Sequence, residues 1–329
     1  MMADSELTRH LRSVLPSEAH KALISSVLPT LIDSISDISK ILKRSQHVSR
    51  AGSANAFGDD QLNVDVLAEN SIRKAISQCP FVVTASSEED PIERSSQDIS
   101  TGSVPEEHYT IAFDPLDGSS IIAPNWTVGT IIGIWQGKTA LNQLPATKQV
   151  AAVLGVYGPR TTAIVTLRLP GFDPVCLELG VGEKGVEDTE IIRTAVRLVE
   201  PPFKTRYFAP ANLRSAAEDA KYMTLVSDFI QKKYTLRYSG GLVPDVVHAL
   251  VKGHGIYISP VTAASKAKLR RLYELFPLAL IVESAGGKAI NPADGTNILD
   301  TPLGDLNETA GLVCGTAEEV DLVKKALLA

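Results

Sequence analysis

The sequence predicts a layered α/β (α+β) fold with mixed sheets, divided into two closely packed domains. The first observation is the length of 329 residues, because single hydrophobic cores stop growing at about 250–300 residues. The second is a series of short strand-like runs between residues 109 and 182, separated by turn residues, which favours an antiparallel or mixed sheet. The third is a change in the pattern of predicted elements near the prolines at 201 and 202. After these prolines, predicted helices alternate with short strands. We therefore expect domains over residues 1–200 and 201–329.

The composition is that of a globular protein and excludes two function classes. Hydrophobic residues make up 44% of the chain and charged residues 21%, which is enough to build a sizeable core. The formal net charge of −6 argues against a general nucleic-acid binder, because such a protein needs a basic surface to displace phosphate counterions. The longest apolar runs have the length of core segments, so we expect no membrane span. A small anionic substrate remains compatible with a local basic pocket.

The cysteines and the N-terminal segment bear on the cellular compartment. Cys79, Cys176 and Cys314 lie far apart and form no C-x-x-C pair, which is typical of buried thiols in a reducing compartment. The first residues carry acidic side chains and lack the apolar region of a secretory signal. We therefore expect a cytoplasmic protein.

The elements of the first half follow from the spacing of apolar residues. Residues 23–43 show three- and four-residue spacing and predict a long amphipathic helix. The Gly-, Ser- and Asn-rich segment 46–63 predicts a loop. Residues 64–77 predict a helix whose inward residues are Val64, Leu67, Ile72 and Ile76. The run "FVVTASSEED" predicts a buried strand that ends on acidic residues.

Further elements follow a polar linker over residues 90–107. Strands are predicted at "YTIAF", "TVGTIIGIW", "VAAVLGVYG", "TTAIVTLRL" and "PVCLELGVG". Beyond residue 200, we expect helices at "AEDAKYMTLVSDFIQKK" and "KLRRLYELFPLALIVESAG" and a strand at "GIYIS". The acids after "FVVTASS" and "YTIAF" thus lie where strands end, and a rigid sheet can hold loop residues there in fixed geometry.

Acidic residues gather in four places along the N-terminal half. They are Asp59 with Asp60, Asp65, Glu88 with Glu89, and Asp114 with Asp117. Side-by-side carboxylates repel one another unless a cation lies between them. Hard oxygen ligands without accompanying Cys or His clusters suit Mg²⁺ or Mn²⁺ rather than zinc.

The segment "FDPLDGSS" combines acids with groups that suit phosphate. Pro115 fixes its φ near −65°, so it holds Asp114 and Asp117 at a defined angle while the carbonyl of Leu116 is available to an ion. Backbone N–H groups and hydroxyls suited to phosphate oxygens follow at Gly118, Ser119 and Ser120. Metal on one side and phosphate on the other is the arrangement for metal-assisted phosphoryl transfer to water.

Each motif also has a simpler interpretation. Asp, Pro, Gly and Ser all favour turns, so "DPLDGSS" alone also fits a solvated turn. "SSEED" alone fits a solvated acidic face, and "SKAKLRRLYE" fits a solvated basic helix face. "GVGEKG" matches a dinucleotide-binding fingerprint, but no clear βαβ unit opens around it, and we expect a hairpin turn there.

Taken together, the motifs resemble those of the Mg²⁺-dependent, lithium-sensitive sugar phosphatases, a family that includes fructose-1,6-bisphosphatase and inositol monophosphatase. The segments "GSANAFGDDQLNVDVLA", "SSEED", "FDPLDGSS", "TVGTIIGIW", "YTLRYSGGLVPDV" and "KAKLRRLYELFPLALIVESAGG" occur in the family's order across nearly the whole chain. The resemblance implies the fructose-1,6-bisphosphatase-like fold, with α-β-α-β-α layers and mixed sheets.

Within that family, the sequence is more similar to the sedoheptulose-1,7-bisphosphatase branch. Ile121 stands where the fructose enzymes usually carry Asn, and "YGPRTT" and "NLRSA" also look like the seven-carbon enzymes. The substrate tyrosine of the fructose enzymes is missing from "ANLRS", and a second tyrosine is replaced near Ser259.

The resemblance also implies roles for individual residues. The implied metal ligands are Asp59, Glu88, Asp114, Leu116 through its carbonyl, Asp117 and Glu274. Asp65 and Glu89 would orient and deprotonate the attacking water. The implied phosphate and sugar contacts are Gly118, Ser119, Ser120, Asn212, Arg237, Tyr238 and Lys268, with Arg214 as an added contact.

We therefore expect an enzyme that uses two or three Mg²⁺, with Mn²⁺ as a substitute, to hydrolyse the 1-phosphate of sedoheptulose 1,7-bisphosphate. The products would be sedoheptulose 7-phosphate and phosphate. Fructose 1,6-bisphosphate is the alternative substrate, and a non-catalytic sugar-phosphate-binding scaffold is the non-enzymatic alternative. The expected partners are the small sugar bisphosphate and further copies of the chain in a homodimer or homotetramer, with neither nucleic acid nor membrane.

Overall fold

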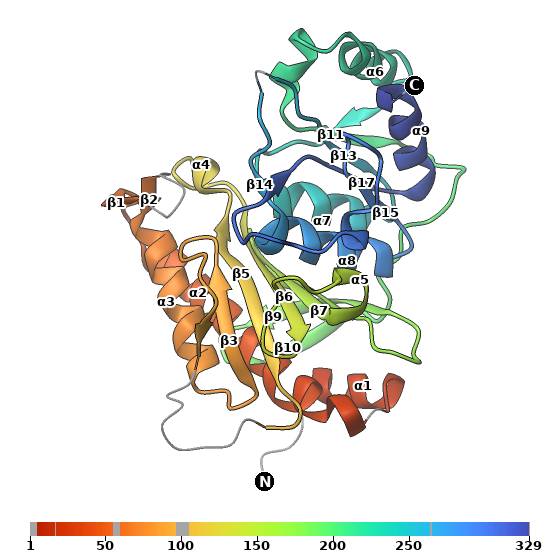
Figure 1. Ribbon diagram of the computed structural model, residues 1–329. Helices are drawn as coiled ribbons and strands as arrows, with labels where there is room; N and C mark the ends of the chain where they lie inside the picture. Colours follow the sequence, from red (N-terminus) through yellow and green to blue (C-terminus); the bar gives the residue numbers. More distant parts are fainter. Residues whose placement is uncertain (1–4, 17, 55–59, 97–104, 264, 329) are drawn as a thin grey trace.

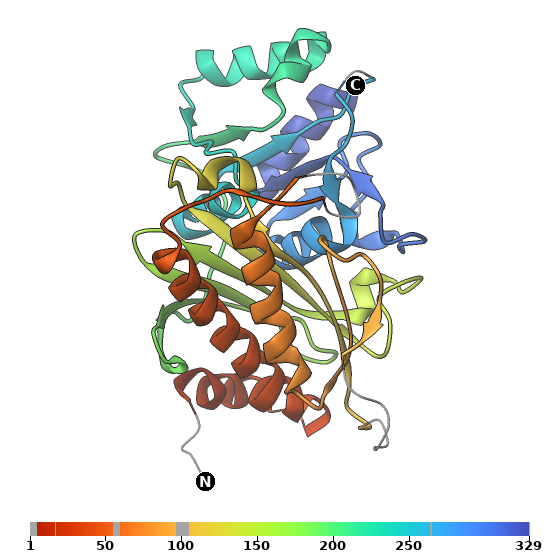
Figure 2. The same cartoon turned by 90° about the vertical axis from the view of Figure 1, so that its left-hand side faces the viewer.

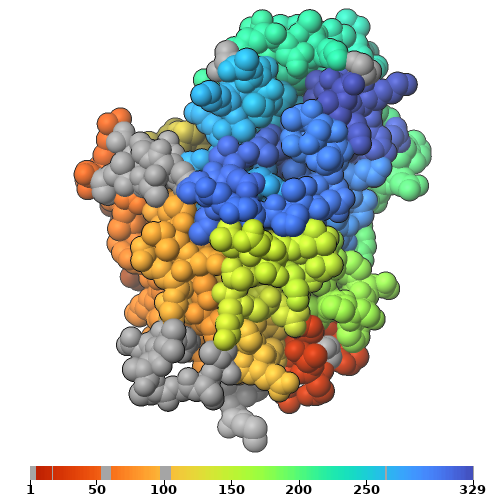
Figure 3. Space-filling view, viewed as in Figure 1, coloured from red at the N-terminus to blue at the C-terminus, as the bar shows by residue number. Residues whose placement is uncertain are grey.

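The computed structural model describes residues 5–16, 18–54, 60–96, 105–263 and 265–328. Within these residues, helices and two large sheets alternate in five layers, in the order α-β-α-β-α (Figures 1 and 2). Figure 3 shows the C-terminal segments packed directly on those of the N-terminal half. The layered α/β fold with mixed sheets predicted from the sequence is confirmed.

The larger sheet belongs to the N-terminal half of the chain. In the described residues its strand order is β10-β9-β8-β7-β6-β5-β3-β4, in which β3 and β5 pair in parallel and the other neighbours are antiparallel. Its strands are β3 (Val82–Ser87), β4 (Arg94–Ser95), β5 (Tyr109–Asp117), β6 (Val128–Gln136), β7 (Gln149–Tyr157), β8 (Thr161–Leu167), β9 (Val175–Gly182) and β10 (Gly185–Arg193). The two-residue connection between β9 and β10 confirms the hairpin predicted at "GVGEKG".

Helices α1 (Glu6–Val14), α2 (Leu28–Arg44) and α3 (Asn63–Ser77) cover the outer face of this sheet (Figure 2). A 3₁₀ turn (Glu18–His20) and a π turn (Leu23–Val27) lead into α2. The helix predicted over residues 23–43 is therefore confirmed, with a π turn at its start. Short strands β1 (Arg50–Ala54) and β2 (Asp60–Leu62) pair with each other within the segment predicted as a loop.

The smaller sheet belongs to the C-terminal half, with strand order β12-β11-β13-β17-β15. It is mixed, because β11 pairs in parallel with β12 and β13 and the remaining pairs are antiparallel. Its strands are β11 (Tyr207–Pro210), β12 (Thr235–Leu236), β13 (Ile256–Ser259), β15 (Lys288–Ile290) and β17 (Leu312–Gly315). A separate pair joins β14 (Leu269–Arg270) to β16 (Thr309–Ala310).

The remaining helices form the middle and outermost layers. Helices α7 (Leu242–Lys252) and α8 (Phe276–Ser284) lie between the two sheets, and α6 (Ala220–Gln231) and α9 (Ala317–Leu328) cover the far face of the smaller sheet (Figure 1). Shorter helical turns are α4 (Ser119–Ile122), α5 (Pro145–Lys148), η3 (Leu213–Ala217), η4 (Arg271–Leu275) and η5 (Ile298–Asp300). The buried apolar residues form three clusters. The first lies between the outer helices and the larger sheet, the second surrounds the middle helices and reaches both sheets, and the third lies between the smaller sheet and its outer helices. None of the helices in the described part of the chain is both long and apolar enough to cross a bilayer.

Two sequence predictions about helices need correction. Leu67 was predicted to face inward, but 43% of it is exposed, whereas Val64, Ala68, Ile72 and Ile76 are buried. The reason is that the inward face of α3 also contains the polar residues Asp65 and Glu69, which turns the helix so that Leu67 points away from the sheet.

The second correction concerns the start of the helix predicted over residues 268–286. Leu269 and Arg270 form a short strand paired with Ala310 and Thr309, and the helical segment begins only at Arg271. A π turn then joins directly onto α8. Lys268 therefore lies in the loop before this strand.

Candidate metal and phosphate site

The two aspartates of "FDPLD" lie at the end of β5, within the strand rather than after it. Asp114 pairs with Ile131 and Asp117 with Gly129, so three steps along β5 match two steps along β6. This β-bulge accommodates Pro115, which cannot donate a ladder hydrogen bond. In a regular strand, residues three apart point to opposite faces. The extra residue allows both aspartates to face the same site.

Hydrogen bonds fix the shape of the bulge. The Leu116 N–H donates to Asp114 Oδ1 at 3.0 Å, and the Thr130 hydroxyl donates to the Pro115 carbonyl at 2.8 Å. Leu116 itself is 4% exposed. The Asp-Pro-Leu-Asp segment is thus held by hydrogen bonds within itself and to the neighbouring strand, in addition to the constraint of the proline ring.

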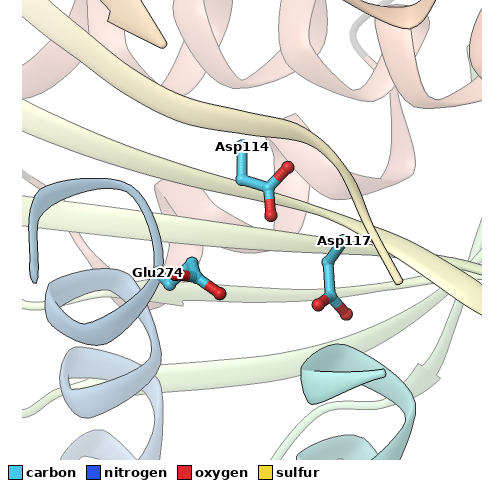
Figure 4. Close-up of side chains that lie close together, drawn as sticks. All are labelled: Asp114, Asp117 and Glu274. Carbon is cyan, nitrogen blue, oxygen red and sulfur yellow. The ribbon is translucent and has the colours of Figure 1, made fainter. Parts of the chain in front are cut away.

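A third carboxylate reaches this site from the C-terminal half of the chain. Glu274 lies in the π turn η4, where its side chain accepts a hydrogen bond from the Arg270 N–H. Oxygen atoms of Asp114, Asp117 and Glu274 lie within 4.8 Å of one another, and all three residues are buried. Figure 4 shows the three carboxylates converging from β5 and from the helical segment before α8.

Burial and mutual repulsion strongly affect the ionisation of this cluster. Burial is the main cause of the raised pKa of Asp114 and of Glu274, and repulsion by Glu88 is the second cause for both. Burial also raises the pKa of Asp117 to about 6. A divalent cation would remove the repulsion, and carboxylate oxygens are the ligands that hard divalent cations prefer. The donor set therefore fits a divalent metal.

Asp117 also connects the site to the helix between the sheets. Its two carboxylate oxygens accept hydrogen bonds from the Leu242 N–H at 3.1 Å and the Val243 N–H at 2.7 Å, at the start of α7. These bonds oppose the effect of burial on the pKa of Asp117. Helix α7 can approach because residue 129 is glycine, since a Cβ there would lie 2.4 Å from the Cβ of Val243.

The acids after β3 lie near this cluster. Glu88 Oε1 is 3.5 Å from Arg270 Nε, and its charge contributes to the raised pKa of both Asp114 and Glu274. Glu89 accepts a hydrogen bond from the Gln61 side chain.

Asp65 lies close to Glu89, at the start of α3. It accepts the Leu62 N–H at 2.9 Å. Burial raises the pKa of Asp65 to about 6, and Glu89 adds to the increase. The predicted ligand Asp59 lies outside the described residues, and the side chain of Asp60 is likewise not described.

The predicted phosphate-binding residues follow Asp117 directly. Gly118 has a φ of 97°, a left-handed conformation that glycine adopts without strain, and it leads into the single turn α4. Ser119 and Ser120 are exposed at the start of that turn. The structure thus brings the exposed hydroxyls of this turn next to the buried carboxylates.

The predicted sugar-side residues lie in the C-terminal half. Arg214, Arg237, Tyr238 and Lys268 are exposed. The charge of Arg214 opposes the burial-driven increase in the pKa of Tyr238, so the two side chains are near each other. The Asn212 amide donates to the Pro260 carbonyl at 2.7 Å and accepts from the Ser265 hydroxyl at 2.6 Å. Asn212 therefore also holds the loop that precedes Lys268.

Arg237 and Tyr238 line a cavity of about 900 Å³ together with Trp126 and His248. None of the three clustered carboxylates belongs to its described lining. The Arg237 guanidinium lies 5.6 Å from the centre of the Tyr207 ring. The structure therefore places Arg237 beside an aromatic ring and in the lining of a cavity that does not include the three carboxylates among its described lining residues.

Sequence reasoning missed Asp245, which holds the turn that contains Tyr238. Its carboxylate accepts the Ser239 N–H at 2.7 Å and the Gly240 N–H at 3.2 Å, and the residue is 6% exposed. Its signal in the sequence is a single acid within the apolar helix "LVPDVVHAL". Ile121 packs beside the same turn, since a Cβ on Gly240 would lie 3.3 Å from Ile121 Cγ2.

Comparisons with known proteins agree with this architecture. The family description "Fructose-1-6-bisphosphatase, N-terminal domain" matches residues 11–185, and "Fructose-1-6-bisphosphatase, C-terminal domain" matches residues 202–328. Among solved structures, a putative sedoheptulose-1,7 bisphosphatase from Toxoplasma gondii superimposes with a TM-score of 0.84 at 30% identity, covering 100% of this chain and 99% of that chain. The holo form of Leishmania major fructose-1,6-bisphosphatase gives 0.82 at 26% identity, covering 98% and 99%.

Relatives found by sequence include proteins named for both sugars. Sedoheptulose-1,7-bisphosphatase of Spinacia oleracea chloroplasts is 38% identical over 83% of this chain and 66% of its own length, so the chain spans slightly less than two thirds of that relative. Fructose-1,6-bisphosphatase class 1 of Syntrophotalea carbinolica is 34% identical over 89% of this chain and 87% of its own length. With both family domains matched in order and the five-layer fold in common, the chain belongs to the fructose-1,6-bisphosphatase family.

Proposed function

We propose that this protein hydrolyses the 1-phosphate of sedoheptulose 1,7-bisphosphate in a Mg²⁺-dependent reaction. The observation that carries the proposal is the buried cluster of Asp114, Asp117 and Glu274 beside the exposed turn at Ser119 and Ser120. The family is metal-dependent, and relatives of this chain are named as sugar bisphosphatases. Water attacks the phosphorus, the bond to the sugar oxygen breaks, and the products are the sugar 7-phosphate and phosphate.

The carboxylate cluster would hold the metal ions. The proposed ligands are Asp59, Glu88, Asp114, the Leu116 carbonyl, Asp117 and Glu274, for two or three Mg²⁺ with Mn²⁺ as a substitute. When bound, the cations supply the positive charge that stabilises the transferring phosphoryl group. Gly118, Ser119 and Ser120 would hold the 1-phosphate through N–H and hydroxyl groups at the edge of the cluster.

Asp65 and Glu89 would orient the attacking water and accept its proton. Burial raises the pKa of Asp65 to about 6. A base with such a pKa is ionised at neutral pH and still accepts a proton readily. Its Oδ1 is buried and, in the described structure, has no hydrogen-bond partner, so a lone pair is available to a water molecule.

The sugar and its distal phosphate would contact the C-terminal half. The proposed contacts are Asn212, Arg214, Arg237, Tyr238 and Lys268. The proximity of Arg214 to Tyr238 supports a shared role for these two side chains. Residues 1–200 would then form the metal-binding domain and residues 201–329 the substrate-binding domain, with Glu274 supplied across the boundary.

Fructose 1,6-bisphosphate is the second candidate substrate. The observation in its favour is the fructose-1,6-bisphosphatase class 1 relative, which matches this chain over most of both lengths. The resemblance supports a homodimer or homotetramer, which light scattering tests directly. Cys79, Cys176 and Cys314 are buried, and none forms a disulfide within the described residues, which supports a cytoplasmic location.

Phosphate release by the purified chain tests the proposal. We expect release from sedoheptulose 1,7-bisphosphate that requires Mg²⁺, stops in excess EDTA and returns when Mg²⁺ is restored. Asp117→Asn should lose this activity while keeping its fold by circular dichroism. A wild-type chain that binds the sugar bisphosphate but releases no phosphate with Mg²⁺ or Mn²⁺ would instead favour the scaffold function.

A further inference from the structure

The turn that carries Glu88 and Glu89 is held by a network of side chains outside the carboxylate cluster. We define the Glu69 network as Glu69, Arg73, Ser87 and Asp90. We propose that Glu69 and Arg73 are positioning residues, which fix the direction in which the two glutamates leave the turn and thereby set the affinity for metal. This inference rests on the proposed function, because it takes the Glu88 turn as part of the metal site.

The network begins on α3. Asp65, Glu69 and Arg73 are four residues apart, so they lie one above the other on one face of the helix. Asp65 is close enough to Glu89 for their charges to interact. Glu69 and Arg73 contact the residues on either side of the glutamates, and the same helix face therefore reaches the whole turn.

Ser87 connects Glu69 to the turn. The Ser87 hydroxyl donates to Glu69 Oε1 at 2.9 Å and accepts the Asp90 N–H at 3.0 Å. The Ser87 N–H donates to the Asp90 carbonyl at 3.2 Å, which closes the four-residue turn. Ser87 is completely buried. Glu69 therefore acts on the turn through the hydroxyl of its first residue, which hydrogen-bonds to the N–H of its last residue.

Arg73 connects the other end of the turn to the strand that carries the aspartates. Its Nε donates to Glu69 Oε1 at 2.5 Å, and its Nη2 lies 3.6 Å from Asp90 Oδ2. The guanidinium also lies 5.6 Å from the centre of the Phe113 ring. Phe113 immediately precedes Asp114, and its carbonyl accepts the Glu88 N–H at 3.0 Å. Arg73 thus contacts both segments that carry proposed ligands.

The charges of the network depend on one another. The Glu69 side chain is 13% exposed, and burial raises its pKa, whereas Arg73 and Ser87 lower it. Removing Arg73 leaves a buried carboxylate without its counter-charge, and removing the charge of Glu69 weakens the bond to Ser87. Residues that orient metal ligands in this way typically contribute about 10–100-fold to metal affinity.

The experiment measures Mn²⁺ binding directly, by the loss of the free-ion electron paramagnetic resonance signal, in Glu69→Gln, Arg73→Met and Arg73→Lys. The matched control is Arg168→Met, which breaks an ion pair of similar exposure with Glu283 (N···O 3.1 Å) at the far end of α8. We expect Glu69→Gln and Arg73→Met to bind Mn²⁺ at least about tenfold more weakly. Arg73→Lys should recover part of the affinity, and the control should bind as wild type does.

The outcomes separate this inference from the proposed function. Wild-type affinity in both Glu69→Gln and Arg73→Met, with melting temperatures reduced as in the control, would overturn the positioning role and leave the phosphatase assignment intact. A wild-type chain that binds no Mn²⁺ and releases no phosphate would overturn both. Weaker binding in the two variants, with partial recovery in Arg73→Lys, supports the inference, because a merely structural ion pair would change stability without this pattern of metal affinity.

Discussion

Asp114 and Asp117 show how a β-bulge at a strand end forms a candidate metal site. The bulge at Pro115 and Leu116 turns two carboxylates to the same side of β5, where Glu274 meets them. This arrangement lowers the stability of the metal-free protein, because three buried acids repel one another when no cation is present. The metal-free protein should therefore be destabilised by the groups that would bind the metal.

Asp114→Asn tests whether repulsion among the buried carboxylates destabilises the metal-free protein. The substitution keeps the shape of the side chain and removes one buried charge that is repelled by Glu88, Asp117 and Glu274. We expect a higher melting temperature than wild type in EDTA and a loss of Mg²⁺-dependent turnover by orders of magnitude. Asp245→Asn is the matched control, because burial also raises the pKa of that carboxyl but its bonds to two N–H groups oppose the rise, so its melting temperature should rise less than that of Asp114→Asn. A lower melting temperature for Asp114→Asn in EDTA would contradict the repulsion.

The raised pKa of Asp117 predicts a pH dependence of stability. Its pKa is about 6 in the folded protein and 3.8 as the ordinary value. The folded state thus binds the proton more tightly, so the contribution of this group to stability is complete below about pH 4 and is lost as pH rises through 6. In EDTA, the melting temperature of wild type relative to Asp117→Asn should fall between pH 4 and 7. A difference that stays constant over this range would contradict the shift.

At the scale of elements, the approach of α7 to β6 organises the site. Gly129 allows Val243 to lie against the strand, which brings two N–H groups of α7 to Asp117. The inward face of α3 similarly brings Asp65, Glu69 and Arg73 to the end of β3. Both arrangements depend on contacts between residues far apart in the sequence.

Gly129→Ala tests the close approach. The added Cβ would lie 2.4 Å from Val243 Cβ, so α7 must move. We expect a loss of about 1–3 kcal/mol in the free energy of unfolding, as for overpacked cores. Mg²⁺ affinity should fall as well. Gly180→Ala is the control, since a Cβ on this strand glycine of the same sheet would meet Ile192 Cδ1 at an ordinary 3.4 Å. Equal unfolding free energies for the two variants in urea titrations would contradict the prediction.

The elements themselves were largely predictable, and the exceptions have physical causes. The strands of the large sheet and the helix over residues 23–43 follow directly from apolar periodicity. The extension of β5 to Asp117 was missed, because a proline normally interrupts a strand and the bulge that tolerates it depends on β6. The strand at Leu269 was missed because its partner, Ala310, is about forty residues away.

At the scale of the whole molecule, the five layers bring the two halves of the chain together around one site. The spacing of residues in the sequence identified the acids of the N-terminal half as candidates. It could not predict that Glu274 lies near them. That residue was predicted from the family resemblance alone, and the structure places it within 4.8 Å of Asp114 and Asp117. The Glu69 network was not predicted, because Glu69 reaches the turn through Ser87 on another element. Asp245 was not predicted, because its carboxylate closes a turn whose backbone geometry the sequence pattern does not specify.

The choice of substrate is also argued at the scale of the whole molecule, because it depends on how the C-terminal half faces the carboxylate cluster. Ile121 packs against the turn before α7, and Arg214 lies near Tyr238 on the same side of the molecule. These contacts join the proposed phosphate-binding turn to the proposed sugar-binding residues. Because both residues differ from the fructose pattern in the sequence, we propose the seven-carbon sugar as the substrate.

The most direct measurement is kcat/KM for Mg²⁺-dependent phosphate release from sedoheptulose 1,7-bisphosphate and fructose 1,6-bisphosphate, compared under identical conditions. We predict that both reactions stop in EDTA and that kcat/KM is higher for the seven-carbon substrate. A clear preference for fructose 1,6-bisphosphate would contradict the substrate assignment, and metal-independent release would contradict the role of the carboxylate cluster.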